Sequence, residues 1–338
     1  MPTQFGESGV MRLLDQSQGL LRLEHIGMSK RTLARFRAAI HQPQGLVLVT
    51  GPTGSGKTTT LYGALSELNR PEVKIISVED PVEYRLPRIN QVQINSRIGL
   101  TFANVLRSSL RQDPDILMVG EMRDEETAEI GLRAAMTGHL VLSTLHTNDA
   151  VSTALRLLDM GAAGYMVASS LQAVLSQRLV RRVCPMCTEK DPLDVVKRNW
   201  LKSMIGSESE GMTFQRGRGC AQCNNTGYRG RIGIFELLEI DDTLADALRR
   251  GASADFATAA QNKSGFRSLT GNALDYAQRG ITSLDEVIRV SGEVEQTLED
   301  LEAVPAEDET AEQKEGNEAA SSERTSEEPS PEARYLEE

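Results

Sequence analysis

Short apolar runs alternate with amphipathic stretches from residue 45 to about residue 180. Continuous apolar runs rich in branched side chains predict buried strands at 45–50, 74–78, 116–119 and 139–144. Apolar positions at helical spacing predict helices at 58–69, 102–112, 124–136, 149–159 and 164–179. Because strands that alternate with helices are typical of a mostly parallel sheet, the pattern predicts an α/β fold.

The chain on either side of this region departs from the alternation. Residues 1–28 contain a short apolar run at 10–14, which we interpret as the last strand of an N-terminal domain of which this segment is a remnant. The alternative is that this segment packs on the part of the chain that follows it. Ser29 is the expected N-cap of a helix that ends before Pro43. Residues 236–292 predict short helices separated by glycine turns, and therefore a C-terminal helical subdomain.

Charge divides the chain more sharply than its net value of −11 suggests. Residues 293–338 hold 17 acidic and 3 basic residues, whereas residues 1–292 hold 31 acidic and 34 basic ones. A segment with many charges and few apolar residues predicts a disordered acidic tail. Such a tail is either a spacer without fixed structure or an interaction segment.

Composition narrows the classes of protein that fit. Of the 338 residues, 39% are hydrophobic but only 7 are Phe, 6 Tyr and 1 Trp, so we expect an aliphatic core. The sequence contains neither an apolar stretch long enough to span a bilayer nor a signal-peptide pattern, so we expect a cytoplasmic chain without direct membrane insertion. A nucleic-acid partner would favour a basic surface with stacking aromatics, which the nearly neutral body does not offer.

Residues 51–58, Gly-Pro-Thr-Gly-Ser-Gly-Lys-Thr, form a complete phosphate-binding loop of the G-x-x-x-x-G-K-[ST] type. A predicted strand precedes the loop and a predicted helix follows it, which is the context that this motif requires. We expect Lys57 to reach the β- and γ-phosphates of a nucleotide and Thr58 to bind Mg²⁺. The predicted nucleotide-binding residues are Gly51, Pro52, Thr53, Gly54, Ser55, Gly56, Lys57, Thr58, Thr59 and Asp80.

Two predicted strands deliver carboxylates at their carboxyl ends, where ligands collect in open α/β sheets. Glu121 follows the strand at 116–119 and is the candidate general base for the attacking water. Many P-loop enzymes place an Asp just before this residue, whereas this chain has Gly120. We expect the acids after the strand at 74–78, Asp80 and Glu83, to replace it, the alternative being a solvated loop with ordinary surface acids.

His139 and His146 bracket the predicted strand at 139–144, although the chain has only four histidines. Their separation of seven residues places them on opposite faces of a straight strand, so one could approach the γ-phosphate while the other contacts a neighbour. The alternative is that each is an ordinary polar residue with satisfied hydrogen bonds.

All four cysteines fall in residues 181–235, as the pairs Cys184/Cys187 and Cys220/Cys223. Two C-x₂-C knuckles in a reducing compartment predict a structural Cys₄ zinc site with no open ligand position. The alternative is two unrelated redox or free-thiol pairs.

Taken together, these motifs resemble bacterial secretion ATPases, specifically those of type II secretion and type IV pilus assembly. The segments that carry the resemblance are residues 51–62, 78–84, 111–124 and 137–148, with the paired cysteines and residues 226–231. The resemblance extends over about residues 6–292. It implies a RecA-like ATPase core at 29–180, a small Cys₄ zinc module at 181–235 and the helical subdomain after it.

The resemblance also implies a function. Such proteins are hexameric ring motors on the cytoplasmic face of the inner membrane, where platform proteins hold them and ATP hydrolysis with Mg²⁺ drives assembly of pilin-like subunits. Glu121 matches the family's catalytic glutamate, and Lys57, Glu83, His139 and His146 are the other expected catalytic residues, with Asp80 in the acidic box. Retraction motors of the same superfamily lack the cysteine module, so the cysteines favour the assembly or secretion branch.

The short N-terminal segment and the acidic tail after residue 293 both depart from the family and leave alternatives open. Family members carry long N-terminal domains whose arginines reach the nucleotide, and Arg12 is the one obvious match here. The chain could therefore be a truncated nucleotide-binding subunit with little or no turnover, and a nucleic-acid translocase is a further alternative. Arginines that act in trans across a ring interface are expected among Arg107, Arg111 and Arg123.

Overall fold

The computed structural model describes residues 2–4, 6–7, 22–209 and 211–292. Its strands are β1 (Pro2–Thr3), β2 (Gly6–Glu7), β3 (Gly45–Thr50), β4 (Ile75–Glu79), β5 (Ile89–Gln93), β6 (Ile116–Val119), β7 (Leu140–Leu145), β8 (Leu171–Val183), β9 (Thr188–Lys190), β10 (Gln215–Gly217) and β11 (Tyr228–Glu239). Its α-helices are α1 (Lys30–Ile40), α2 (Lys57–Leu68), α3 (Phe102–Ser109), α4 (Glu125–Met136), α5 (Ala150–Asp159), α6 (Gly164–Ser170), α7 (Val195–Ile205), α8 (Asp242–Arg250), α9 (Ser253–Gln261) and α10 (Leu269–Gln278), and residues 284–292 are also helical.

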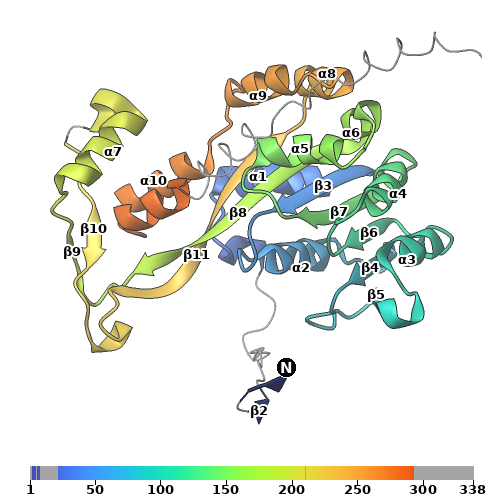
Figure 1. The fold of residues 1–338 in the computed structure, drawn as a ribbon, viewed down its shortest axis with the longest axis horizontal. Helices are drawn as coiled ribbons and strands as arrows, with labels where there is room; N and C mark the ends of the chain where they lie inside the picture. The colour runs from blue at the N-terminus through green and yellow to red at the C-terminus, as the bar shows by residue number, and fades with distance from the viewer. Residues whose placement is uncertain (1, 5, 8–21, 210, 293–338) are drawn as a thin grey trace, which may run out of the picture. The chain divides into compact units, whose positions relative to one another are not determined.

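A seven-stranded sheet with the order β11-β8-β3-β7-β6-β4-β5 organises this part of the chain (Figure 1). The strands from β8 to β5 run parallel, and β11 pairs with β8 in the antiparallel direction. The predicted α/β class with a mostly parallel sheet is confirmed. Parallel strands bring their carboxyl ends to one edge, so the segments that follow β3, β4, β6 and β7 meet there.

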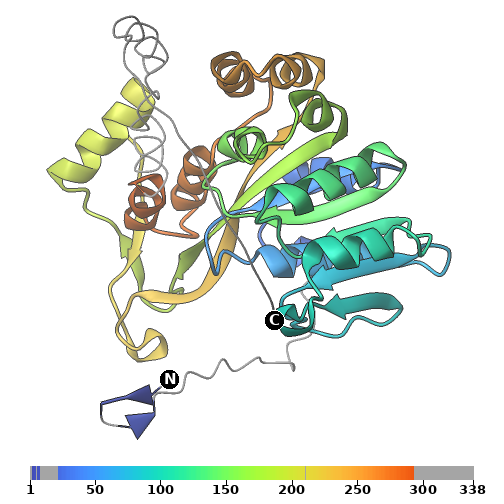
Figure 2. The same cartoon turned by 45° about the vertical axis from the view of Figure 1, so that its right-hand side comes forward.

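Helices cover both faces of the sheet (Figure 2). Along β3, Leu46 and Leu48 pack on one face with α3, α4, α5 and α6, whereas Val47 and Val49 pack on the other face with α1 and α2. This alternation follows from the period of two in a strand. Because β3 is buried on both faces, its sequence is a continuous apolar run, which is why the run at 45–50 could be recognised as a strand.

The helix predicted at 164–179 is wrong for most of its length. The chain is helical only from Gly164 to Ser170, and the following residues form β8, a strand of 13 residues. β8 pairs with both β3 and β11 and is buried on both faces along most of its length. A buried strand and a buried helix are both apolar, so periodicity alone did not separate them.

Two further strands of the seven-stranded sheet, β5 and β11, were not predicted. β8 and β11 cross the boundaries expected at residues 180 and 235 and continue as a long two-stranded ribbon, with β9, β10 and α7 beyond its far end (Figure 1). A separate apolar cluster lies along this ribbon, where Val180 and Ile234 pack with α10 and the helical residues 284–290. The predicted helical character of the C-terminal region is confirmed, although its first residues belong to β11.

From residue 22 onward, the N-terminal segment is built into the core. Leu23 and Ile26 are buried against α1 and α2, and the carbonyl oxygen of Ile26 accepts a hydrogen bond from the amide of Gly233 at 3.1 Å. Ser29 caps α1 as predicted, since its hydroxyl accepts from the amide of Thr32 at 3.0 Å. The strand expected at 10–14 and the tail expected at 293–338 lie outside the described residues. Within the described ranges, no helix combines the length and apolar character that crossing a membrane requires.

Candidate functional site

A cavity of about 670 Å³ opens at the carboxyl edge of the sheet. It lies where the phosphate loop, the acidic segment after β4 and the segments after β6 and β7 converge. Its lining comprises Thr53, Gly54, Gly56, Lys57, Thr58, Thr59, Leu61, Tyr62, Glu79, Asp80, Pro81, Glu83, Met118, Gly120, Glu121, Arg123, Thr144, His146, Leu179 and Arg231. A volume of this size falls within the range that small-molecule sites have.

The phosphate loop joins β3 to α2, as its sequence predicts. Gly51, Gly54 and Gly56 have positive φ angles of 143°, 80° and 92°, which favour glycine. Helix α2 begins at Lys57, so the amides of its first turn face the same cavity as the loop. Pro52 and Ser55 complete the loop, and the hydroxyl of Ser55 is buried without a hydrogen-bond partner.

Lys57 is held inside the loop. Its ammonium donates to the carbonyl oxygen of Gly51 at 2.7 Å and to that of Pro52 at 3.1 Å, and it lies 3.5 Å from Nδ1 of His146. Burial lowers the pKa of Lys57, and the charge of Glu121 opposes that effect. The loop thus combines the ammonium group of Lys57 with the backbone amides of the loop and of the first turn of α2, an arrangement suited to phosphate oxygens.

Glu121 follows β6 and points into the cavity with only 13% of its side chain exposed. Its carboxylate pairs with Arg123 and lies 3.5 Å from Nε2 of His146. Burial is the main cause that lowers the pKa of His146, and the charge of Lys57 adds to it. Because the ordinary pKa of histidine is already about 6.5, His146 is neutral at pH 7 and can accept or donate a hydrogen bond.

Gly120 occupies the position at which many P-loop enzymes have an Asp. A Cβ atom there would lie 3.2 Å from the carbonyl oxygen of Val78 and 3.5 Å from Cα of Glu79, so a side chain has little room. The hydroxyl of Thr144 donates to the carbonyl oxygen of Gly120 at 2.7 Å and ties β6 to β7. The close approach of two strands therefore accounts for the glycine.

Asp80 and Glu83 line the same cavity as Glu121. Glu79, at the end of β4, fixes the start of this acidic segment because its buried carboxylate accepts hydrogen bonds from Tyr62 of α2 and, at 2.5 Å, from Ser77. The structure thus brings together the acids that we expected to compensate for Gly120. Their roles in catalysis stay predictions.

The two histidines lie at opposite ends of β7. His146 lines the cavity, whereas His139 precedes β7 at the amino edge of the sheet, where its Nδ1 lies 3.0 Å from the carbonyl oxygen of Ala134. The structure therefore does not bring His139 to the candidate site. Residues that flank a six-residue strand end at opposite edges of the sheet, regardless of the face to which each points, which separates His139 from His146. The catalytic role expected of His139 stays a prediction.

The sequence does not predict several residues of the site. Leu179 and Arg231 line the cavity from β8 and β11, neither of which was predicted as a strand. Of the three arginines expected to act in trans, the structure brings Arg123 to the cavity, whereas Arg107 pairs with Glu126 on the outer surface of α3 and α4. Arg111 follows α3, and its guanidinium donates to the carbonyl oxygen of Arg107 at 2.8 Å.

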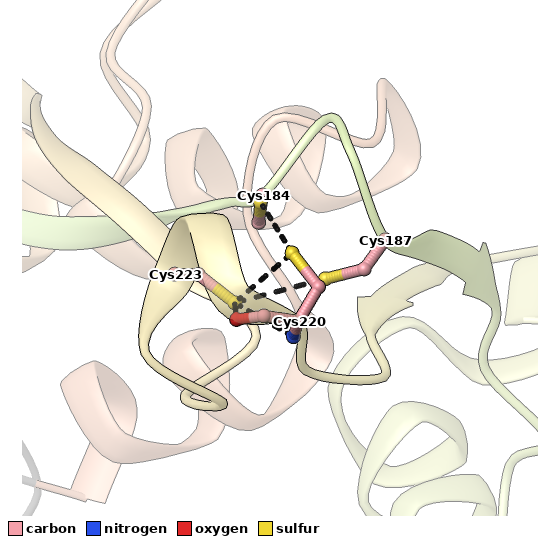
Figure 3. A group of neighbouring side chains, drawn as sticks. All are labelled: Cys184, Cys187, Cys220 and Cys223. Carbon is pink, nitrogen blue, oxygen red and sulfur yellow. Dashed lines mark hydrogen bonds between the residues drawn. The ribbon is translucent and has the colours of Figure 1, made fainter.

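The four cysteines form a second candidate site (Figure 3). Their sulfur atoms all lie within 4.8 Å of one another, with separations of 3.9 Å for Cys184/Cys220, 3.8 Å for Cys187/Cys223 and 3.7 Å for Cys220/Cys223. Sulfur atoms at about 2.3 Å from a tetrahedral zinc ion are about 3.8 Å apart. The cluster therefore has the donor atoms and spacing of a Cys₄ zinc site.

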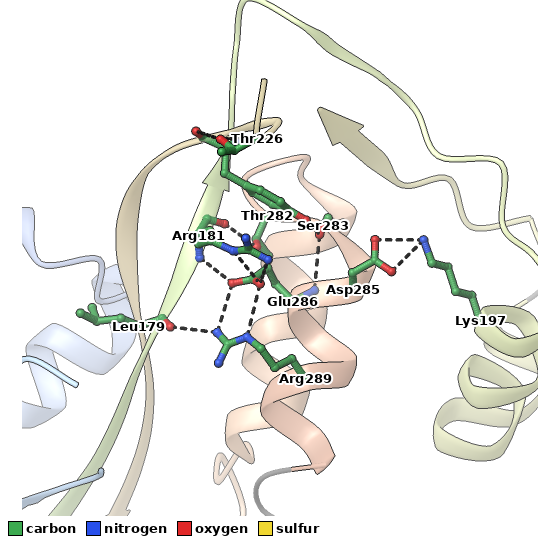
Figure 4. Close-up of polar contacts among 10 residues, drawn as sticks. Leu179, Arg181, Lys197, Thr226, Thr282, Ser283, Asp285, Glu286 and Arg289 are labelled. Atoms are coloured by element: carbon green, nitrogen blue, oxygen red, sulfur yellow. Dashed lines mark hydrogen bonds and ion pairs between the residues drawn. The ribbon is translucent and has the colours of Figure 1, made fainter. Parts of the chain in front are cut away.

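A buried carboxylate anchors the ribbon that carries this cluster (Figure 4). Glu286 is 1% exposed and accepts from the backbone amide of Arg181 at 2.8 Å, from its guanidinium at 2.8 and 3.0 Å, and from that of Arg289 at 3.1 and 3.3 Å. Arg181 also lies 4.1 Å over the ring of Tyr228 in β11. These contacts join β8, β11 and the C-terminal helix three residues before the first cysteine.

The sequence matches the family model described as type II/IV secretion system protein over residues 1–289. The chain belongs to this family. The resemblance seen in the sequence motifs is thereby confirmed.

Named relatives agree with this assignment. The chain is 49% identical over 292 residues to the type II secretion system protein HxcR of Pseudomonas aeruginosa, covering 86% of this chain and 58% of the relative. It is 50% identical over 288 residues to the type IV pilus assembly ATPase PilB of Myxococcus xanthus, covering 85% and 51% respectively. The chain thus spans about half the length of the curated relatives that it matches.

Solved structures share the fold. The pilus retraction motor PilT with bound ADP aligns with a TM-score of 0.60 at 28% identity, over 82% of this chain and 69% of that chain. The ATPase DotB of Legionella pneumophila aligns with a TM-score of 0.59 at 22% identity, over 81% and 66%, which supports the fold alone. The RecA-like core that the resemblance implied is confirmed.

Proposed function

We propose that this chain is the ATP-hydrolysing part of a ring motor for type II secretion or type IV pilus assembly. The observation that carries the proposal is the cavity in which a complete phosphate loop faces a shielded carboxylate, Glu121, across the carboxyl edge of the sheet. Phosphoryl transfer needs a cradle for the phosphates and a group that orients the attacking water. Both are supplied here by one chain, and relatives with ATPase in their names support the assignment.

Each residue has a stated role in this proposal. The loop amides and Lys57 bind the β- and γ-phosphates, and Glu121 accepts the proton of the attacking water. Thr58, Asp80 and Glu83 supply hard oxygen ligands of the kind that Mg²⁺ takes, and the ion would neutralise phosphate charge. His146 lies 3.5 Å from both Lys57 and Glu121, and it keeps these two side chains in position relative to each other.

We further propose that six copies form a ring on the cytoplasmic side of the inner membrane, held there through platform proteins of the secretion or pilus system. A ring would let a neighbouring copy supply a cation to the transferred phosphoryl group, which can raise the rate by about 10³–10⁵. Arg107 and Arg111 lie on the outer surface and Arg123 at the cavity mouth, so each is a candidate.

The test is ATP turnover by the purified chain with Mg²⁺, measured across a range of protein concentrations with light scattering on the same samples. We expect turnover per chain to rise as rings form. Binding of ATP without turnover would instead identify a nucleotide-binding subunit. Turnover stimulated by single-stranded DNA would identify a nucleic-acid translocase.

We also propose that Cys184, Cys187, Cys220 and Cys223 hold a structural zinc ion. The sulfur separations of 3.7 to 3.9 Å support it, since four thiols at this spacing repel one another once deprotonated unless a cation neutralises them. All four ligand positions are cysteines, so the ion would stabilise the far end of the β8–β11 ribbon and take no part in hydrolysis.

A further inference from the structure

Gln177 is a buried polar residue in contact with the phosphate loop. It lies on β8 and is 2% exposed. Strand β8 pairs with β3, the strand that leads into the loop. A buried amide is costly unless its hydrogen bonds are made. The sequence pattern predicts a helix at Gln177, so it does not predict this contact.

Both ends of the Gln177 amide are used. Its nitrogen donates to the carbonyl oxygen of Ser55, inside the loop, at 2.7 Å. Its oxygen accepts from the hydroxyl of Thr60, in the first turn of α2, at 2.6 Å. Because the carbonyl of Ser55 can only accept, the orientation of the amide is fixed by chemistry. One side chain thus ties the middle of the loop to the start of the helix.

The loop glycines approach the same residue closely. A Cβ atom at Gly51 would lie 2.2 Å from the backbone oxygen of Gln177, and one at Gly56 would lie 2.7 Å from the side-chain nitrogen Nε2 of Gln177. Glycine is therefore required at positions 51 and 56 for two reasons: the φ angles are positive, and a larger side chain would collide with Gln177. The loop is packed against β8 at two glycines and bonded to it at Ser55.

The two neighbours of Gln177 in β8 contact the segment after β7, which carries His146 into the cavity. On the opposite face of the strand, Arg178 donates to the side-chain oxygen of Asn148 at 2.9 Å, and the hydroxyl of Ser176 donates to the carbonyl oxygen of Asn148 at 3.3 Å. Asn148 follows His146 by two residues. Because side chains alternate along β8, Gln177 contacts the phosphate loop, whereas Ser176 and Arg178 contact the segment after β7 that contains His146 and Asn148.

We propose that Gln177 is a positioning residue that holds the phosphate loop in its anion-binding shape and thereby sets nucleotide affinity. The inference rests on the proposed nucleotide-binding function. Loop amides bind phosphates tightly only when their directions are fixed before binding. Since backbone amides cradle the α- and β-phosphates, which ATP and ADP share, a loosened loop should weaken both nucleotides equally.

The experiment compares Gln177→Leu with a matched control in the same strand, Gln172→Leu. Gln172 lies at the amino end of β8, five residues before Gln177 and beside Gly45. ATP and ADP dissociation constants are measured by fluorescence titration, with kcat, KM and thermal unfolding recorded on each variant. We expect Gln177→Leu to raise both dissociation constants about tenfold, the loss that one or two hydrogen bonds represent, and KM to rise more than kcat falls. Gln172→Leu should stay within about twofold of wild type on the same scale.

Unchanged dissociation constants in folded Gln177→Leu would overturn the inference, whatever its melting temperature does, because a purely structural role predicts lower stability alone. If that variant does not fold, Thr60→Val decides the matter. It removes only the donor to the Gln177 oxygen and should raise both dissociation constants several-fold, by about 2–5 times. Wild-type nucleotide affinity in Thr60→Val would then reject the inference. Failure of the wild-type protein to bind ATP or ADP would instead reject the proposed function.

Discussion

The ammonium group of Lys57 donates a hydrogen bond to the carbonyl oxygen of Gly51 at 2.7 Å, so the first and seventh residues of the phosphate loop are bonded to each other. The same ammonium bonds to Pro52 and lies beside His146. A lysine that is buried in this way has exchanged water for loop carbonyls and can turn toward a phosphate without being desolvated again.

Lys57→Ala should abolish nucleotide binding. The variant loses the one cation within the loop and leaves the carbonyl oxygens of Gly51 and Pro52 facing the phosphates. We expect the dissociation constants for ATP and ADP to rise by about 10² or more, because charge-assisted bonds to two phosphates are lost. Titration with a fluorescent nucleotide measures this.

The matched control is Lys202→Ala on the exposed surface of α7, which should bind like wild type. Binding of ATP by Lys57→Ala with wild-type affinity would show that the phosphates sit elsewhere.

Glu121→Gln should separate binding from hydrolysis. The amide retains the size of the carboxylate but cannot take the proton of the attacking water, so kcat should fall by about 10²–10⁴. The nucleotide dissociation constants should rise at most a few-fold, about 2–3 times, since the loop is untouched. Steady-state turnover and equilibrium titration on the same preparation measure both quantities.

Glu126→Gln serves as the control, because Glu126 is exposed on α4 and pairs with Arg107 away from the cavity. Wild-type turnover in Glu121→Gln would mean that another group orients the water, and Glu83 would be the next candidate.

The strand–loop–helix unit at residues 45–68 could be predicted from sequence almost to the residue. β3 is a continuous branched run and the glycines mark the turn, so each local signal agrees with the final structure. The acids after β4 and β6 could be placed at one edge for the same reason, since parallel strands share their carboxyl edge.

β8 could not be predicted because its partners are distant in sequence. Gln177 bonds to Ser55 and Thr60, which lie 122 and 117 residues earlier, and nothing near Gln177 signals those contacts. β11 pairs with β8 across the whole cysteine module, so its run of residues from Tyr228 to Glu239 lacked a visible partner too. Local patterns report the burial of a residue, whereas a site built from strands far apart in sequence depends on their pairing.

Loss of the zinc ligands should unfold the far end of the ribbon while leaving the nucleotide site intact. Cys223→Ser removes one thiolate from the cluster, and zinc binding energy at a structural site is folding energy. We expect wild-type protein purified without chelators to contain about one zinc per chain and the variant much less, as elemental analysis would show. ADP affinity should change by no more than about threefold, since the cysteines lie outside the cavity.

Met186→Ser is the control, because Met186 sits between two of the cysteines and is 67% exposed. It should keep both its zinc and its thermal stability. A zinc content below about half an ion per wild-type chain would reject the site.

Glu236→Gln should change how stability depends on pH. Glu236 is 3% exposed on β11, and its two oxygens accept from the first backbone amides of α5 (Ala150, 2.7 Å) and α10 (Leu269, 2.9 Å). Burial is the largest cause that raises the pKa of Glu236 from 4.5 to about 7, and the charge of Asp149 adds to it, although the two amides oppose the shift. The folded protein therefore retains a proton that the unfolded chain has already released.

The sign follows from this difference in proton binding. The stabilising contribution of the protonated carboxyl is fully present below pH 4.5 and is lost as the pH rises through about 7, because the unfolded state loses its proton first. At about 1.4 kcal/mol per unit, the wild type should lose about 3 kcal/mol relative to Glu236→Gln between pH 4.5 and 8. The side chain of glutamine has one acceptor oxygen instead of two for the two helix amides, which costs about 1–2 kcal/mol at every pH.

Urea unfolding of both proteins at pH 5, 6, 7 and 8 gives the difference in unfolding free energy directly. Glu126→Gln is the exposed control and should follow wild type. A difference that stays constant over this range would show that Glu236 ionises alike in the folded and unfolded states, and that the two helix amides compensate fully for its burial.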